Sequence, residues 1–318
     1  MSAPRLTFYC ELPEGPLARL FDERAGLVET LAAMRAGVSV GLLDLSDERA
    51  EVVRRLVRAG VRVSAWMLLP YDDGYFQHVE NALASEARFD ALHAWSAREG
   101  LAWDAIGLDI EPDRRELERI PEAPWQTARL ALRRVLDRAR LRRGLDAYRA
   151  LVERIKRTGL PVESYQVPVI ADDRRAGTQM LSRAVGMMDL PVDREVWMLY
   201  SSILPFGPAW LASYGREAPA IAIGSTGGGI DPYPPLQWDA LRRDLLLARR
   251  FTDDLYVFSL EGCVEQDLLP RIAALDWTAA IEREPELVRA GRRADAVRAA
   301  LSATLRVGSR LGRLASRE

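Results

Sequence analysis

Two carboxylates, Asp109 and Glu111, end an apolar run that begins at Ala105. Side chains alternate along a strand, so these two acids would share one face while the aliphatic residues between them face covering helices. Burying two ionisable groups on one face costs free energy unless they are hydrogen-bonded or take part in a reaction. We therefore interpret this segment as the floor of an active site that transfers protons through carboxylic acids.

Short apolar runs alternate with long amphipathic helical runs along most of the chain, and these elements must position the acidic pair. This alternation is typical of βα units and a parallel sheet. Eight strands at this spacing favour a single (β/α)8 TIM barrel, an α/β fold. A doubly wound open sheet is the alternative, but no Gly-x-Gly-x-x-Gly turn follows the first strand. The expected strands are 6–11, 38–44, 61–69, 105–111, 162–170, 195–202, 220–224 and 255–261, with helices that include 48–59, 126–158 and 235–250.

Catalytic side chains in such barrels lie at the C-terminal ends of the strands. Here those ends are rich in acidic and aromatic residues, a mixture that is typical of a carbohydrate cleft. Sugar faces stack on aromatic rings, while carboxylates and amides bind hydroxyl groups. Phe8, Phe258 and Trp197 are expected to be ordinary core residues instead. The catalytic candidates are Glu111, Asp109, Tyr200 and Glu261, and the substrate-binding candidates are Glu11, Asp44, Trp66, Gln166 and Asp172.

The segment from Asp104 to Glu111 resembles the fourth-strand signature of the chitinase-like glycoside hydrolases of family 18, which is Asp-x-x-Asp-x-Asp-x-Glu. Met198-Leu199-Tyr200 is similar to the sixth-strand Met-x-Tyr of the same family. The resemblance implies a TIM barrel in which Glu111 is the general acid and Asp109 steadies an acetamido group of the substrate. It also implies that Tyr200 orients the reacting sugar.

Two positions depart from that family's pattern. Gly107 stands where the family has an acidic residue that hydrogen-bonds the next Asp, and Ser201 stands where it usually has Asp or Asn. Both positions belong to the machinery by which the substrate's own N-acetyl group would assist the reaction. The sequence therefore predicts carboxylate chemistry more firmly than N-acetyl participation.

Glu261 offers a second route to a two-carboxylate mechanism. If Val257, Ser259 and Glu261 face inward along strand 255–261, Glu261 would lie at the rim of the barrel, opposite the fourth strand. Glycoside cleavage commonly uses one carboxylic acid on the leaving oxygen and one carboxylate as nucleophile or base, and their separation decides between retention and inversion. The stereochemical outcome stays open. The alternative for Glu261 is to pair with one of the many arginines.

Composition excludes several classes of function. Lys and Arg total 44 against 46 acidic residues, so no basic bias indicates nucleic acid or an anionic membrane as a partner. Lys156 is the only lysine and lies in a polar helical run, which argues against Schiff-base catalysis. Two histidines and two cysteines are too few for a His-based metal site, a zinc site or a disulfide framework. We expect neither a metal nor a cofactor.

The first residues lack the pattern of a signal peptide, and no run approaches eighteen apolar residues. We accordingly expect a cytoplasmic protein that acts on a soluble oligosaccharide or sugar conjugate. Residues 1–278 are expected to form the barrel. Residues 279–318 are expected to form a C-terminal helical extension that packs on it and ends in a mobile tail. The apolar stripe of that helix is also a candidate contact for a homodimer.

Two other functions compete with a glycoside hydrolase. The glycine-rich stretch 224–229 follows the seventh strand, where many TIM barrels bind phosphate through backbone amides, and it favours a phosphate-binding metabolic enzyme. Against that reading, Glu261 and Glu265 in the next loop would repel a phosphate. A barrel with an incomplete catalytic set could also be a catalytically inactive carbohydrate-binding protein.

Overall fold

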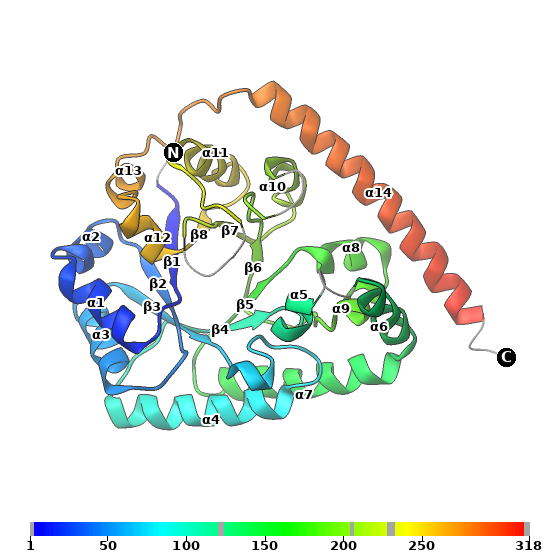
Figure 1. Cartoon of the computed structure of the whole chain (residues 1–318), viewed down its shortest axis with the longest axis horizontal. Helices are drawn as coiled ribbons and strands as arrows, with labels where there is room; N and C mark the ends of the chain where they lie inside the picture. The colour runs from blue at the N-terminus through cyan, green and yellow to red at the C-terminus, as the bar shows by residue number, and fades with distance from the viewer. Residues whose placement is uncertain (1–2, 120–123, 204–206, 228–232, 315–318) are drawn as a thin grey trace.

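The computed structural model describes residues 3–119, 124–203, 207–227 and 233–314. Eight parallel strands pair in sequence order, and β1 pairs with β8 to close the barrel (Figure 1). The predicted α/β TIM barrel is therefore confirmed. The strands are β1 Arg5–Cys10, β2 Gly37–Gly41, β3 Arg62–Met67, β4 Ala105–Ile110, β5 Val162–Gln166, β6 Arg194–Met198, β7 Ala220–Gly224 and β8 Asp254–Phe258.

Helices connect the strands and cover the outside of the barrel (Figure 1). The predicted helix 126–158 is two helices, because Asp137 ends the first and caps the second by accepting a hydrogen bond from the amide of Arg140 at 2.9 Å. The helices are α1 Glu14–Glu23, α2 Leu27–Ala33, α3 Asp47–Arg58, η1 Tyr71–Asp73, α4 Ala82–Glu99, α5 Arg114–Arg119, α6 Pro124–Leu136, α7 Arg138–Lys156, α8 Val169–Ala176, α9 Met180–Val185, α10 Pro208–Tyr214, α11 Trp238–Arg249, α12 Leu260–Glu265, α13 Leu269–Ala273 and α14 Glu284–Leu314. No helix in the described ranges is long and apolar enough to cross a membrane.

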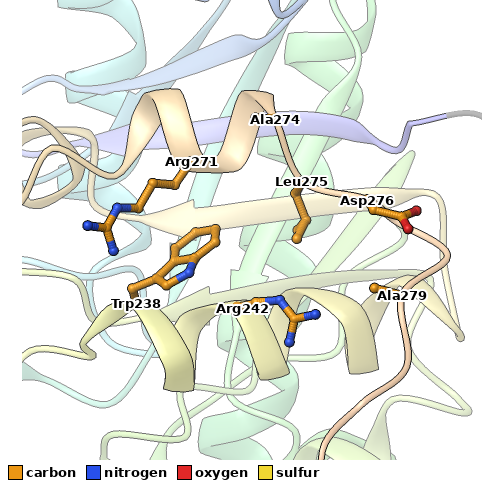
Figure 2. Close-up of a pocket in the computed structure, with 7 residues that line it drawn as sticks. All are labelled: Trp238, Arg242, Arg271, Ala274, Leu275, Asp276 and Ala279. Carbon is orange, nitrogen blue, oxygen red and sulfur yellow. The ribbon is translucent and has the colours of Figure 1, made fainter.

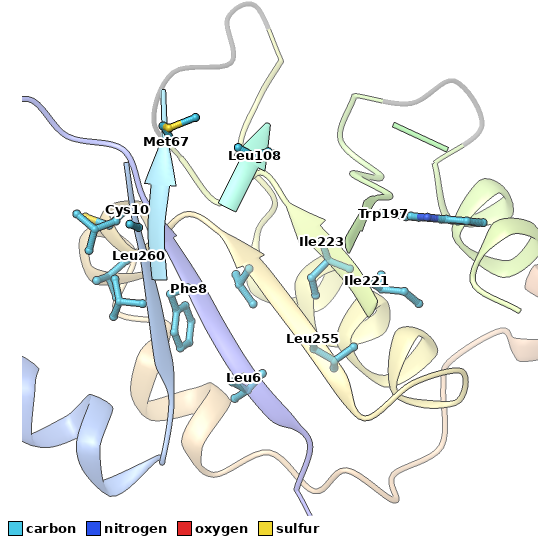
Figure 3. Close-up of a cluster of buried hydrophobic side chains, with 14 of the residues drawn as sticks. Leu6, Phe8, Cys10, Met67, Leu108, Trp197, Ile221, Ile223, Leu255 and Leu260 are labelled. Carbon is cyan, nitrogen blue, oxygen red and sulfur yellow. The ribbon is translucent and has the colours of Figure 1, made fainter. Parts of the chain in front are cut away.

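The barrel wall separates two apolar layers. Leu108, Ile223 and Leu255 belong to the outer layer, between the strands and the helices (Figure 3). The inner layer is largely aromatic, with Tyr9 packed against Trp66 and other rings. On β4 the aliphatic residues face outward and Asp109 faces inward, which is the alternation that the sequence predicts.

Seven of the eight strands, all except β7, end one to four residues earlier than predicted, and at β5 and β8 a new helix explains the early end. β5 ends at Gln166, and the chain turns at Pro168 into α8, so the predicted strand 162–170 is wrong beyond its fifth residue. β8 ends at Phe258, and Ser259 caps α12 by accepting a hydrogen bond from the amide of Gly262 at 3.3 Å. A short polar cap residue starts a new helix in the second case, where an alternating apolar pattern alone would extend the strand.

The long C-terminal helix α14 packs against α10 and α8 (Figure 1). Arg298 of α14 is fully buried, and its Nε donates to the Asp172 carboxylate at 2.9 Å. The guanidinium carbon also lies 3.6 Å from the centroid of the Tyr214 ring, and Tyr214 donates to Asp172. These contacts attach the helix to the barrel's outer surface. The predicted mobile tail falls partly on residues 315–318, which lie outside the described ranges.

Gly107 on β4 leaves the space that the Tyr165 ring occupies. A Cβ at position 107 would lie 2.4 Å from the Tyr165 hydroxyl oxygen. That hydroxyl is hydrogen-bonded to Ser39 at 2.8 Å and to Glu163 at 3.0 Å, so the ring cannot move without breaking buried polar contacts. The inner layer therefore requires glycine where the family-18 signature has an acid.

We predict that Gly107→Ala lowers the free energy of unfolding by about 1–3 kcal/mol, because the added methyl group overpacks the barrel interior. Chemical denaturation monitored by circular dichroism measures this loss. Gly15→Ala on α1 is the control, since its Cβ would meet only an arginine tip at 3.5 Å. The substitution Tyr165→Leu should lower the free energy of unfolding by less in the Gly107→Ala variant than in the wild type, because it removes the ring that the added methyl group meets. Equal stability of the two glycine variants would contradict this packing.

Candidate active site

Asp109 lies at the C-terminal end of β4 and is almost fully buried, with 1% of its surface exposed. The indole nitrogen of Trp66 donates to its Oδ2 at 3.1 Å, whereas its Oδ1 is buried without a hydrogen-bond partner in the part of the chain that is described. An unpaired buried carboxylate oxygen is costly. Asp109 is therefore either protonated or waiting for a ligand that donates a hydrogen bond.

Gln77 fixes the backbone on which Asp109 stands. Its side-chain oxygen accepts from the amide of Asp109 at 2.7 Å, and its side-chain nitrogen donates to the carbonyl of Met67 at 2.8 Å. Its own amide donates to the carbonyl of Asp109 at 2.8 Å. One buried glutamine thus joins the ends of β3 and β4, which holds the site floor in place.

Glu111 follows two residues after Asp109, and the two buried carboxyl groups are close enough for each to shift the pKa of the other. Burial, and then the nearby negative charge of Glu11, raise the pKa of Glu111 to about 7, although the interactions with Asp109 and Arg114 oppose the rise. The pKa of Asp109 is raised well above its ordinary value, first by burial and then by Glu111 and Glu11. The two acids are therefore able to share a proton near neutral pH.

Glu261 reaches the same mouth from α12. Its Oε1 lies 3.5 Å from the amide nitrogen of Glu11, and its Oε2 is buried without a partner among the described residues. Burial raises the pKa of Glu261 to about 7, even though its own amide and Ser259 stabilise the charged form. Glu11 in turn accepts a hydrogen bond from the Tyr75 hydroxyl, and burial raises its pKa as well.

Two tyrosines complete the interior of the site. Burial, followed by the charges of Asp109, Glu111 and Glu11, raises the pKa of Tyr200. The Tyr200 hydroxyl thus faces the acids as a neutral hydrogen-bond donor. Tyr9 lies deeper, and its hydroxyl is buried without a partner in the described structure. Both groups suit a polar ligand that enters the mouth.

The structure brings six of the nine predicted site residues together. All six lie on inner faces or rim segments of the barrel and are connected by the contacts and charge interactions above: Glu11, Trp66, Asp109, Glu111, Tyr200 and Glu261. Glu261 arrives there for a different reason than predicted. On β8, Tyr256 and Phe258 face inward and Val257 faces outward, which is the reverse of the predicted alternation. The strand ends at Phe258, and the turn into α12 brings Glu261 to the mouth.

Three predicted substrate-binding residues have other roles. Asp44 receives hydrogen bonds from Arg49 and Ser46, which overcome partial burial and lower its pKa to about 2. Asp172 lies on α8 and is paired with Arg298, outside the barrel. Gln166 is paired in register with Ile110 and Trp197, both of which belong to the outer layer, so it faces away from the barrel interior.

Sequence reasoning missed Gln77, Tyr75 and Arg114 as site residues. Arg114 follows the acidic pair, and its guanidinium carbon lies 4.8 Å from the centroid of the Tyr75 ring. The signal for Tyr75 was its place in the aromatic loop after β3. Gln77 carried no signal, because a single polar residue in a loop does not reveal that it pairs with a strand 32 positions away.

The two departures from the family-18 pattern have structural reasons. Gly107 accommodates Tyr165, as described above. The Ser201 hydroxyl donates to Asp244 on α11, so it serves the contact between β6 and the helix layer. Asp104, the first acid of the signature, accepts from the amide of Val63 at 2.7 Å at the opposite end of the barrel.

The loop after β7 uses its first amides internally. The amide of Ser225 donates to the Ser202 hydroxyl at 2.8 Å, and the amide of Thr226 donates to the carbonyl of Phe258 at 2.7 Å. These two amides are therefore not directed at a phosphate. Gly228 and Gly229 lie outside the described residues. Within the described ranges, no group of three or more His, Cys, Asp or Glu side chains is arranged to hold a metal ion.

Neither the family models nor the curated proteins that were compared with the sequence give a match. Among solved structures, the glycoside hydrolase domain of PgaB (BpsB) from Bordetella bronchiseptica is similar at 11% identity, covering 88% of this chain and 100% of that one, with a TM-score of 0.48. The 3-keto-D-glucoside 4-epimerase YcjR from E. coli is similar at 15% identity, 86% and 100% coverage and a TM-score of 0.47. An L-ribulose 3-epimerase is similar at 14% identity, covering 97% of each chain, with a TM-score of 0.42. With these identities and with TM-scores below 0.5, the comparisons carry no conclusion about the function of this chain.

We predict that Glu111→Gln raises the melting temperature at about pH 8 by roughly 2 °C or more and changes it less at about pH 5. Because the pKa of Glu111 is about 7 in the folded protein and 4.5 ordinarily, the folded state binds more protons between these values. The stabilisation that protonated Glu111 gives to the folded state is therefore complete below about pH 4.5 and is lost as the pH rises through about 7. Because glutamine cannot ionise, the Glu111→Gln variant does not lose stability in this way as the pH rises.

Differential scanning calorimetry at both pH values makes this measurement. Glu153→Gln on the exposed face of α7 is the matched control, and it should leave both melting temperatures unchanged. A lower melting temperature for Glu111→Gln at the higher pH would contradict the burial of an ionisable Glu111.

Proposed function

We propose that this barrel is a glycoside hydrolase that acts on a soluble oligosaccharide or sugar conjugate. The observation that carries the proposal is the buried, electrostatically coupled pair Asp109 and Glu111 at the C-terminal mouth, with the further buried carboxylate of Glu261 at the same mouth. Glycosidases place one acid to protonate the leaving oxygen and another carboxylate to support the anomeric carbon or its attacking water. The resemblance of the fourth strand to family 18 supports the same assignment.

In this mechanism Glu111 is the general acid. A pKa of about 7 keeps a large fraction of Glu111 protonated near neutral pH, and its proton passes to the glycosidic oxygen as the bond to the anomeric carbon breaks. Asp109 receives the hydrogen bond of Trp66 and is the acid next to Glu111 that can take up the shared proton again. Tyr200 donates its hydroxyl to the sugar ring.

Glu261 supplies the second carboxylate. It either attacks the anomeric carbon, or it removes a proton from a water molecule whose oxygen then bonds to that carbon. In the first case Glu111 then takes a proton from a water molecule, whose oxygen displaces Glu261 from the anomeric carbon, and both acids return to their starting states. In the second case Glu261 releases its proton to solvent and Glu111 regains one from solvent, so the elements of water are added to the products in both cases. The rings of Trp66 and Phe258, whose centroids lie 6.3 Å apart, are almost fully buried in the inner layer.

We predict that Glu111→Gln lowers turnover of a cleaved glycoside by about 10²–10⁴, because it removes the mobile proton with little change of shape. A panel of chromogenic glycosides and natural oligosaccharides identifies the substrate first, and the rate profile with pH should fall as Glu111 loses its proton near pH 7. Glu153→Gln should retain wild-type turnover.

Two outcomes would contradict the proposal. Full activity of Glu111→Gln on the natural substrate would end the general-acid assignment. Binding of an oligosaccharide by the wild type without cleavage of any glycoside, detected as a rise in melting temperature, would identify a carbohydrate-binding barrel instead.

A further inference from the structure

A cavity lies on the outside of the barrel, between α11 and α13. It has a volume of about 410 Å³ and is lined by Trp238 and Arg242 of α11, Arg271 of α13, and Ala274, Leu275, Asp276 and Ala279 of the segment that follows (Figure 2). Its position on the helix layer separates it from the carboxylates at the barrel mouth. The volume falls within the range of ordinary small-molecule sites.

An indole between two guanidinium groups defines this cavity. Figure 2 shows Arg271 on one side of the Trp238 ring and Arg242 on the other, with Leu275 above the gap between the helices. The guanidinium carbon of Arg271 lies 5.8 Å from the centroid of the Trp238 ring. The indole is held in place because it is partly buried against the outer core layer.

The positive charge of Arg242 lies near enough to Asp276 to lower the pKa of that carboxyl further, after the hydrogen bonds from Thr278, but no close contact neutralises either arginine within the described part of the chain. Arg242 and Arg271 make no hydrogen bond and no ion pair there, whereas Arg243 on the same helix pairs with Asp244 at 2.9 Å. The carboxylate of Asp276 also lies at the cavity edge. It accepts from the amide of Thr278 at 2.9 Å and from its hydroxyl at 2.6 Å, which turns it toward its own loop.

These features fit one class of ligand. An apolar wall of indole, leucine and alanine side chains favours a flat ring, and an arginine over an indole favours stacking of planar groups. Two guanidinium groups whose N–H donors make no hydrogen bond within the described residues favour an anion, since arginine binds phosphate and carboxylate with paired N–H donors. We propose that this cavity binds a planar aromatic ring that carries an anionic group, a site separate from the proposed hydrolase chemistry.

The test uses calorimetric titration of the whole protein with AMP and with indole-3-acetate, which present the same chemistry as a phosphate and as a carboxylate. Adenosine and inorganic phosphate are the ring alone and the charge alone. We expect AMP or indole-3-acetate to bind with a Kd of about 1 mM or tighter, and the two half-ligands to bind at least about tenfold more weakly. Whichever of the two anions binds more tightly identifies the group.

Arg242→Ala and Arg271→Ala should each weaken that binding by about tenfold or more, and Trp238→Leu should do the same by removing the stacking surface. Arg292→Ala on the exposed face of α14 is the control and should bind as the wild type does. Melting temperatures of all four variants establish that they are folded. Absence of binding at about 10 mM of either ligand, or binding that the three cavity variants leave unchanged, would overturn the proposal.

Discussion

The cost of burying carboxylates at one end of the barrel governs the site. Glu11, Asp109, Glu111 and Glu261 all have a raised pKa, and burial is the largest cause in each. Such a group is tolerated only if it holds its proton or gains hydrogen bonds. Tyr75, Trp66 and the amide of Glu11 supply some of these bonds, and the orphan oxygens of Asp109 and Glu261 remain for a ligand.

The barrel wall makes this arrangement possible. Its outer face is aliphatic and packs on helices, so the fold does not depend on the inner face for its main core. The inner face is then available for rings and acids. Tyr9, Tyr165 and Tyr256 fill the lower part, and Glu163 accepts the hydroxyl groups of the latter two at 3.0 Å. This polar anchoring fixes the rings on which the acidic mouth stands, at the price of requiring glycine at position 107.

The sequence predicts the barrel and the fourth-strand acids because both depend on local patterns. Periodicity gave the strand order, and alternation placed Asp109 on the inner face. It could not place Asp172, since Pro168 starts a helix where the apolar run continues, and it could not place Gln166, which the register of β5 turns outward. Nor could it identify Gln77, whose role depends on a long-range backbone contact. Glu261 lies at the mouth although the alternation predicted for its strand was wrong, because the chain changes direction at the helix-capping residue Ser259.

The central claim is that Glu111 keeps its proton near neutral pH. Carbon-13 NMR of protein labelled at the glutamate side-chain carboxyl carbon measures this directly, with the Glu111→Gln spectrum assigning the resonance. The account predicts a titration of that carboxyl with an apparent pKa of about 7. A midpoint at the ordinary glutamate value of 4.5 would show an open, solvated carboxylate and would contradict the account.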